Sequence, residues 1–252
     1  MRIGVLEGVF DLSPAAWVRE RLTTFGVNVA SVIPEGFERY GRILHPARRD
    51  GRPVSWSEVA AHNSRAVHPE MQWHAISGLP PGEPGAPWDE GPMAGSIPED
   101  LTGVLVEHLR SHTTTPGSVW FAVWTGWGAH RLAPRPGTRA SGGVQALPDR
   151  DEPLPPAFEL PAREYWLLHG PIEGALETMS SRGWQSVNLW WPEDRAWFVS
   201  TEIDFAWTYV GGTRELIDGL MADPRLEVLH ASLTDGVAFD ADRVNGSDPE
   251  DQ

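Results

Sequence analysis

The clearest alternation of apolar and polar residues lies in the last quarter of the chain. Between residues 197 and 205 the odd positions are mostly apolar, whereas Ser200, Glu202 and Asp204 mark the other side. Successive side chains of a strand point to opposite faces of its sheet. The pattern therefore predicts a strand with one face buried and the other in water.

The residues around this strand predict a compact supersecondary unit. Residues 192–195 have turn composition, so we expect the apolar run 188–191 to pair back as a hairpin. Gly211, Gly212 and Thr213 then open a helix with one apolar stripe, which Pro224 ends. Residues 226–231 follow as a closing strand. The unit is a β-hairpin, a helix and a strand.

Apolar spacing and helix-capping residues predict further short elements along the chain. Helices are expected at residues 15–25, 55–62, 99–110 and 172–181, and strands at 2–6, 28–33, 40–45, 118–124 and 165–169. Gly and Pro make up 26 and 23 of the 252 residues, which indicates long loops and disfavours an all-helical fold.

The weakest periodicity in the chain falls at residues 131–162, which are rich in Pro, Gly and charged residues. We therefore predict an α+β protein with two lobes of mainly antiparallel sheet and short helices packed on them. Residues 1–130 would form the N-terminal lobe, 131–162 a linker, 163–241 the C-terminal lobe, and 242–252 a disordered tail.

Several classes of chemistry are excluded by the composition. The chain has no cysteine, which removes disulfides, thiolate nucleophiles and thiolate metal sites. All twenty basic residues are arginines, which excludes Schiff-base chemistry. The N-terminal region carries Glu7 and Asp11 where a signal peptide would be apolar, and no run has the length of a membrane span. We expect a soluble, cytoplasmic protein.

The formal charge of −15 is unevenly distributed. Residues 1–130 contain ten arginines and fourteen acidic residues, whereas residues 131–252 contain ten and twenty-one. Such a field repels nucleic acid and anionic lipid and attracts a basic protein. We expect a basic protein partner and neither nucleic acid nor membrane, with the oligomeric state left open. The alternative is that the acidic residues have no specific partner and only keep the tryptophan-rich chain soluble.

The proposed contact surface lies around the predicted hairpin. Trp190 and Trp191 are neighbours on a strand and face opposite ways, so one of them would be free to act as an aromatic platform. Arg195 in the turn, with Glu202 and Asp204 on the next strand, would supply the charged part of the surface. The alternative is a solvated strand face with each tryptophan covering a separate core.

A metal-assisted hydrolase is the competing interpretation. His68, Glu70 and His74 form the densest His/carboxylate cluster, and Glu202 with Asp204 would leave one strand face as a pair. The spacing matches no established ligand pattern, and histidines packed or hydrogen-bonded in a loop explain the cluster equally. We assign no catalytic residue, no metal and no cofactor.

Three weaker motifs have ordinary structural explanations. His108 and His112 are four residues apart on a helix, but Leu109 stands where a zinc-protease motif needs glutamate. The Gly211–Gly212–Thr213 run suits either an anion or a tight turn. The one basic patch, which would suit nucleic acid, consists of Arg39, Arg42, Arg48, Arg49 and Arg52.

Three long strings resemble an actinobacterial family of uncharacterised proteins: WWPEDRAWFVSTEIDFAWTYVGGTRELIDGLMADPRLE, HPEMQWHAI and HTTTPGSVWFAVWTGWG. The resemblance implies a coherent soluble fold and supplies no catalytic residues. We therefore predict a non-catalytic acidic binding protein, with the metal-assisted hydrolase as the alternative and a tryptophan-lined small-molecule or sugar site as a third hypothesis.

Overall fold

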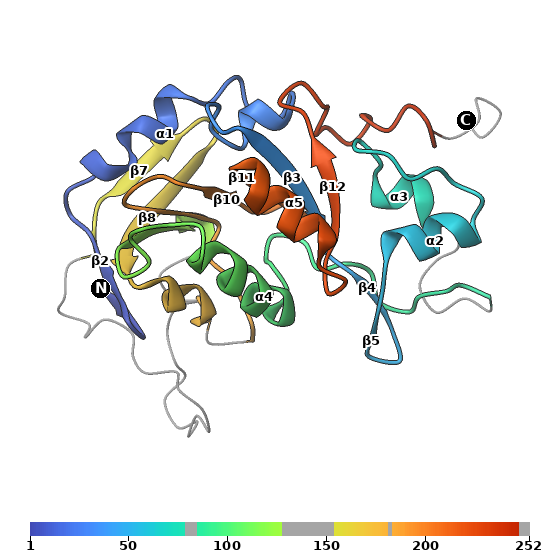
Figure 1. Cartoon of the computed structure of the whole chain (residues 1–252), viewed down its shortest axis with the longest axis horizontal. Helices are drawn as coiled ribbons and strands as arrows, with labels where there is room; N and C mark the ends of the chain where they lie inside the picture. The colour runs from blue at the N-terminus through green and yellow to red at the C-terminus, as the bar shows by residue number, and fades with distance from the viewer. Residues whose placement is uncertain (79–84, 128–153, 181–182, 247–252) are drawn as a thin grey trace.

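The computed structural model describes residues 1–78, 85–127, 154–180 and 183–246. Within them, twelve strands are formed (Figure 1). They are β1 (Arg2–Ile3), β2 (Leu6–Gly8), β3 (Arg39–Leu44), β4 (Ala47–Arg49), β5 (Arg52–Val54), β6 (Val119–Trp124), β7 (Ala157–Leu160), β8 (Arg163–Gly170), β9 (Leu189–Pro192), β10 (Phe198–Ser200), β11 (Trp207–Gly212) and β12 (Glu227–Ala231). Ten of these strands form one antiparallel sheet in the order β1-β2-β8-β6-β9-β10-β11-β3-β12, with β7 also paired to β8, while β4 and β5 form a separate hairpin.

The helices of the described residues are short. They are α1 (Ala16–Glu20), α2 (Trp56–His62), α3 (Trp73–Ile76), α4 (Glu99–Arg110) and α5 (Arg214–Ala222), with 3-10 turns at Ser13–Ala15, Val29–Ser31, Thr125–Trp127 and Ile172–Leu176. Within the described part of the chain, no helix has the length and apolarity needed to cross a lipid bilayer.

Local sequence explains where the two best-defined helices begin. The Ser55 side chain accepts a hydrogen bond from the backbone N–H of Glu58, and the Glu58 carboxylate accepts one from the backbone N–H of Ser55. This capping box starts α2. The Thr213 hydroxyl likewise accepts from the backbone N–H of Leu216 and starts α5. The predicted helix 99–110 and the hairpin of β9 and β10 are also confirmed.

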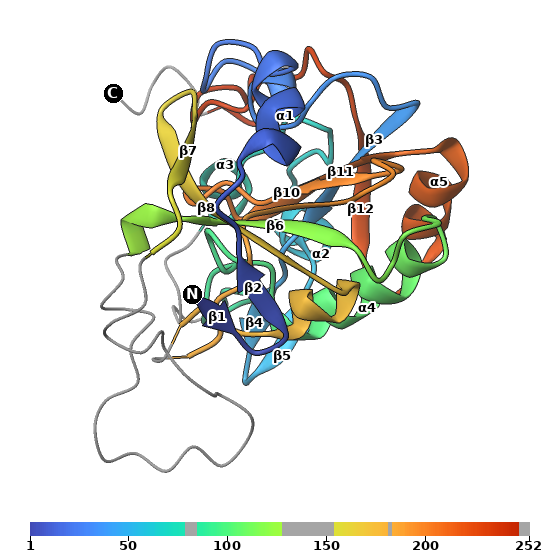
Figure 2. The ribbon, with the colours of Figure 1, turned by 90° about the vertical axis from the view of Figure 1, so that its left-hand side faces the viewer.

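The sheet is covered on both faces. Figure 2 shows α1 on one side of β6, β8 and β10 and α4 on the other. One core contains apolar residues of α4 and α5, and the second contains residues of α1 and of the 29–33 segment. The strands serve both cores by alternation, so Trp190 belongs to the first core and Trp191 to the second.

The strand predicted at residues 197–205 is only partly formed. β10 ends at Ser200, and the backbone N–H of Thr201 still donates across the hairpin to the carbonyl of Asn188 over 2.8 Å. Residues 201–206 then form no strand. All residues from Trp197 to Glu202 are buried. The expectation of a water-exposed strand face is wrong because this strand is central and both of its faces are covered.

Three other predicted elements differ from the structure. Val29–Ser31 forms a 3-10 turn in place of the strand expected at 28–33, and the helix expected at 172–181 is a 3-10 turn at Ile172–Leu176. α1 stops at Glu20, although the pattern extended to residue 25. Short apolar runs do not by themselves distinguish a strand from a buried turn.

The class prediction of α+β with mainly antiparallel sheet is confirmed, whereas the two lobes are not. β6, from the first half of the chain, lies between β8 and β9 from the second half. β3 lies in the same way between β11 and β12. The two halves therefore interleave within one sheet.

The predicted linker and tail also need correction where the structure describes them. Residues 131–153 of the linker lie outside the described residues, but β7 follows and pairs with β8 over four residues. The predicted tail begins with Asp242 and Asn245, which are 6% and 3% exposed and hydrogen-bonded to each other. These residues belong to the folded body.

Candidate functional site

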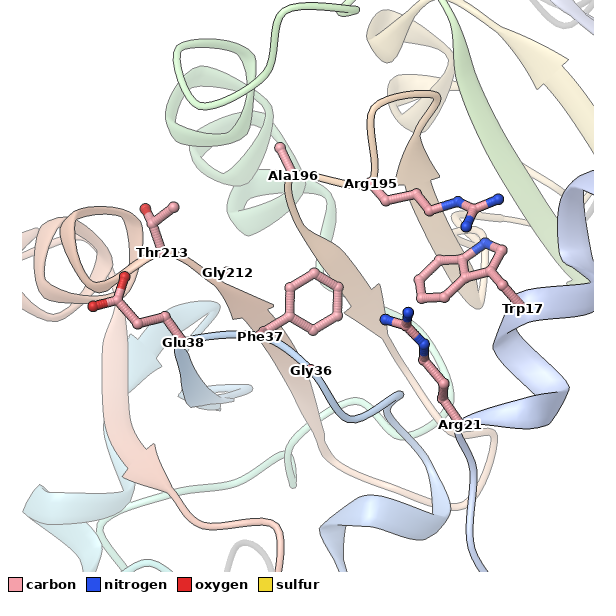
Figure 3. A pocket seen from close by; sticks show the side chains of 9 residues that line it. All are labelled: Trp17, Arg21, Gly36, Phe37, Glu38, Arg195, Ala196, Gly212 and Thr213. Carbon is pink, nitrogen blue, oxygen red and sulfur yellow. The ribbon is translucent and has the colours of Figure 1, made fainter.

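A surface pocket of about 230 Å³ lies where α1, the 36–38 segment, the β9–β10 turn and the start of α5 meet (Figure 3). These elements are far apart in the sequence and are brought together by the order of the sheet. The lining residues are Trp17, Arg21, Gly36, Phe37, Glu38, Arg195, Ala196, Gly212 and Thr213. We call this the Trp17 pocket.

The indole of Trp17 forms one wall of the pocket and is fixed from behind. Trp17 is 6% exposed. Its ring packs edge-on against Trp191, with ring centroids 6.1 Å apart, and against Phe198 at 5.7 Å. Such T-shaped contacts are favourable arrangements of aromatic rings. Its Nε1 atom is buried and has no hydrogen-bond partner among the described residues.

Two arginines converge on this indole. Arg21 lies one helical turn after Trp17, and its Cζ atom is 5.5 Å from the ring centroid. Arg195 comes from the β9–β10 turn, with its Cζ atom 5.1 Å from the same centroid. Figure 3 shows the two side chains reaching the indole from different directions. Both are exposed, and neither forms an ion pair with a carboxylate of the described residues.

The backbone of the turn aims Arg195 at the pocket. Arg195 has φ of 54°, a left-handed conformation that costs an ordinary side chain roughly 1–2 kcal/mol. Its N–H donates to the carbonyl of Pro192 over 2.9 Å. A strained side chain of this kind, at a position where glycine or asparagine would cost less, points to a functional role for Arg195.

The acidic neighbour of Arg195 is engaged elsewhere. Asp194 accepts hydrogen bonds from the hydroxyls of Thr113 and Thr114 and from the backbone N–H of Thr114. Burial alone would raise the pKa of Asp194, but these hydrogen bonds outweigh it and lower the pKa. Asp194 therefore ties the turn to the loop after α4 and does not neutralise Arg195.

The opposite end of the pocket is already neutral. Glu38 accepts from the backbone N–H of Arg214 over 3.0 Å and pairs with the Arg214 side chain at 3.4 Å. The hydrogen bond from that N–H holds the pKa of Glu38 below its usual value.

At Gly36, with φ of 110°, a Cβ atom would lie 3.0 Å from Nη1 of Arg21. The missing side chain thus leaves room for the guanidinium.

Of the five residues predicted as a contact surface, one lines this pocket. Arg195 does, while Trp190 and Trp191 are 0% and 1% exposed. These two tryptophans cover separate cores, which was the alternative interpretation. Trp191 nevertheless supports the pocket, since it packs behind Trp17.

Glu202 and Asp204 lie away from the pocket and share one arginine. Arg163 donates from Nε and Nη2 to Oε1 of Glu202 at 2.9 and 2.6 Å, and from Nη2 to Oδ2 of Asp204 at 2.9 Å. Burial raises the pKa of Glu202, although Arg163 opposes the change. The guanidinium occupies the position between the two carboxylates that a metal ion would need.

The residues of the predicted His/carboxylate cluster each have another partner. His68 Nε2 lies 2.8 Å from Oδ1 of Asp242, and Glu70 accepts from the backbone N–H of Gly236 over 2.6 Å. The ring of His74 stacks on Phe239 at 3.7 Å. Within the described residues, no group of three or more His, Asp or Glu side chains is arranged to hold a metal ion.

The weaker motifs follow their structural explanations. His108 Nε2 lies 2.8 Å from Asp223 Oδ2, and the Nδ1 atom of His112 bonds the carbonyl of His108. The basic patch is divided: Arg42 is buried with its Cζ atom 3.9 Å from the ring centroid of Trp207, whereas Arg48, Arg49 and Arg52 lie together on the β4–β5 hairpin. Arg39 and Arg48 pair with acidic residues.

The sequence interpretation missed most of the Trp17 pocket. Trp17, Arg21 and Phe37 were not singled out, although an aromatic residue and an arginine four positions apart on a helix lie on the same face. This spacing was the only local signal of the pocket in the sequence, because the other lining residues come from distant segments, namely residues 36–38, 195–196 and 212–213.

Comparison of the chain with protein-family models finds no match, and searches of the curated proteins and of the solved structures return none. The resemblance to an actinobacterial family therefore stays an expectation. The function has to be argued from the geometry of the pocket.

Proposed function

We propose that the protein is a non-catalytic binding protein that takes up a small organic anion in the Trp17 pocket. The observation that carries the proposal is the convergence of Arg21 and Arg195 on one indole, with no carboxylate partner for either in the part of the chain that the structure describes. Guanidinium groups are planar donors that suit carboxylate and phosphate groups.

The charge balance around the pocket favours such a ligand. Two like charges near one aromatic ring repel each other, and an anion between them would remove that repulsion. The protein as a whole is strongly acidic, so long-range attraction for an anion is absent and the contacts must act locally. Two charge-assisted hydrogen-bonded contacts of about 1.5–3 kcal/mol each correspond to a dissociation constant on the order of 1 mM.

The lining residues support binding in preference to catalysis. The one hydroxyl among them belongs to Thr213, and it accepts the N-capping hydrogen bond of α5. Glu38, the one carboxylate among them, is tied to Arg214. The lining thus offers donors and an aromatic wall, with no nucleophile next to a general base.

The basic protein partner expected from the overall acidity stays a prediction. The surface assigned to it is reduced, because Trp190 and Trp191 are buried. Arg195 and Asp204 remain exposed, and no described contact shows what either would meet outside the chain.

Titration calorimetry with phosphate and carboxylate compounds tests the proposal. Arg21→Ala and Arg195→Ala should each weaken binding about tenfold, the loss of one charge-assisted contact. Arg19→Ala is the matched control, because Arg19 is an exposed arginine of the same helix outside the pocket. The proposal fails if no anion of the panel binds, or if Arg19→Ala weakens binding as much as Arg21→Ala.

A further inference from the structure

The charges that face the Trp17 pocket amount to two positive groups. Arg21 and Arg195 are unpaired within the described residues, whereas Glu38 and Arg214 neutralise each other at the far end. A ligand group with two negative charges would match the two free guanidinium groups. A carboxylate brings one charge, so it would leave one arginine without compensation.

The directions of the two arginines also discriminate between anions. Arg21 approaches the indole from the end of α1 and Arg195 approaches it from the β9–β10 turn, so their donors reach the pocket from two directions (Figure 3). A carboxylate offers two oxygens, which share a plane with their carbon. The three terminal oxygens of a phosphate monoester are arranged around a tetrahedral phosphorus and can accept from donors in two directions.

Beyond the arginines the pocket continues over an aromatic ring. Phe37 is partly buried, and its ring contacts Tyr40 edge-on with centroids 6.1 Å apart. Its backbone N–H donates to the Tyr40 hydroxyl over 3.1 Å. Figure 3 shows this ring between the arginines and the Glu38–Thr213 end. An apolar substituent of a ligand held by the arginines would lie against it.

We infer that the Trp17 pocket selects a phosphate monoester dianion, with Arg21 and Arg195 on the phosphate oxygens and an apolar substituent against Phe37. This inference rests on the proposed function and names the ligand class of the same site. Inorganic phosphate would occupy the arginine end alone, and an aryl phosphate would use both ends.

The charged groups at the pocket are arginines and carboxylates. The charged lining residues are Arg21, Arg195 and Glu38, with Arg214 bound to Glu38 and Asp194 next in sequence to Arg195. None of the lining residues is a histidine. A change of affinity between about pH 5 and pH 7.5 would therefore report the second ionisation of the phosphate, whose pKa is about 6.

Calorimetry with phenyl phosphate, inorganic phosphate and benzoate tests the inference. Phenyl phosphate should bind about tenfold more tightly at pH 7.5 than at about pH 5, because the dianion fraction rises about tenfold. Benzoate, which is already ionised at about pH 5, should show little change. At neutral pH phenyl phosphate should exceed benzoate about tenfold, and Arg21→Ala or Arg195→Ala should remove that preference. Phe37→Ala should lower the affinity for phenyl phosphate to that for inorganic phosphate and leave the latter unchanged.

The outcomes separate the two proposals. Equal affinities for phenyl phosphate and benzoate, both lost in Arg21→Ala, would overturn the phosphate preference and leave the anion pocket standing. Undetectable binding of all three compounds would overturn both. Binding that persists in the Arg21→Ala/Arg195→Ala double variant would place the site elsewhere and also overturn both. Thermal unfolding of each variant, compared with Arg19→Ala, verifies that it is folded.

Discussion

Two regions of the molecule place arginine beside aromatic rings, with opposite results. Arg163 has its Cζ atom 4.7 Å from the ring centroid of Phe25, and its charge is taken up by Glu202 and Asp204. Arg195 has its Cζ atom 5.1 Å from the ring centroid of Trp17, and its acidic neighbour Asp194 bonds the threonine loop instead. Both arginines make the same cation–π contact.

The difference lies in what else each arginine meets. The Arg163 side chain is 16% exposed and the Glu202 side chain 4%, so this pair is part of the interior. Arg195 and Arg21 are exposed at an open pocket. Arg163 is paired with a carboxylate of the protein interior and so contributes to stability. Arg21 and Arg195 have no such carboxylate partner among the described residues and are therefore available to a ligand. Of the four predictions that follow, the first and the last test this distinction, and the other two test polar groups that belong to the interior.

The largest effect is expected from Arg163→Met. The substitution leaves Glu202 buried without its partner, which should lower the free energy of unfolding by about 3–5 kcal/mol at neutral pH. Urea denaturation measures the change. Glu202 would then favour its protonated form, so the loss should shrink as the pH falls toward the ordinary pKa of glutamate, where the unfolded chain is protonated as well.

Two controls sharpen that result. Asp204→Asn should cost less than about 1 kcal/mol, because the Asp204 side chain is 73% exposed. The double change Arg163→Met/Glu202→Gln should recover part of the lost stability, since no charge is then left in the interior. An Arg163→Met variant as stable as an Arg195→Met variant would contradict the comparison.

The second effect concerns the pH dependence of stability through His45. Burial lowers the pKa of His45 to about 4, against an ordinary 6.5. Between these values the unfolded chain binds the proton and the folded chain does not, so stability falls as the pH decreases through this window. The contribution is about 2–3 kcal/mol between pH 7 and about pH 4.5.

His45→Gln should remove this part of the pH dependence of stability. Urea unfolding of the variant and of the wild type at pH 7 and about pH 4.5 measures the free energy of unfolding from which the difference is taken. His45 bonds the carbonyl of Met93 at 2.7 Å and the hydroxyl of Thr208 at 2.9 Å, so the variant should also be less stable at neutral pH. His62→Gln, at an exposed position, is the control and should leave the slope unchanged. An equal slope in wild type and His45→Gln would refute the prediction.

The third effect, of about 2 kcal/mol, is expected from Asp242→Asn. Asp242 accepts from the backbone N–H groups of Gln72 and Asn245 at 3.0 and 2.8 Å. Burial would raise the pKa of Asp242, but these hydrogen bonds outweigh it and lower the pKa. Asparagine has one carbonyl oxygen and cannot replace both carboxylate oxygens.

Limited proteolysis of residues 236–246 measures the loosening caused by Asp242→Asn. Cleavage should become faster in the variant, because this segment would open more often. Asp240→Asn changes an exposed neighbour and should leave the cleavage rate as in the wild type. Equal rates in the two variants would show that Asp242 is as dispensable as a surface carboxylate.

The smallest effect separates stability from binding at Arg195. Arg195→Ala keeps the left-handed strain, whereas Arg195→Gly relieves it, so the glycine variant should be about 1 kcal/mol more stable than the alanine variant. Both variants should lose the same affinity for anions. If the glycine variant retains wild-type affinity, Arg195 does not contact the ligand.

Local signals in the sequence were enough to predict the helices and strands whose ends are marked by capping or turn residues. The Ser55–Glu58 capping box, the run into α4 and the turn before β10 were all recognisable from neighbours a few residues away. The 29–33 segment was misjudged because a short segment with four apolar residues suits a buried turn as well as a strand.

The pairing of distant strands could not be inferred in the same way. The alternation from Trp197 predicted that one face of the strand is exposed to water, which would be correct for a sheet covered on one face only. The presence of α1 on that side depends on how β6, β9 and β10 order themselves. The Trp17 pocket has the same origin: Arg195 was identified from its turn, but its proximity to Trp17 follows from tertiary structure.

The position of β3 between β11 and β12 has a consequence for the nascent chain on the ribosome. β3 is made before both of its neighbours, because β11 is complete only once residue 212 has been translated and β12 only once residue 231 has been. At ordinary elongation rates this leaves both edges of β3 unpaired for roughly ten to forty seconds. Unpaired edges invite pairing with other chains, so synthesis of this protein should depend on a chaperone that shields the early segment until the last strand emerges.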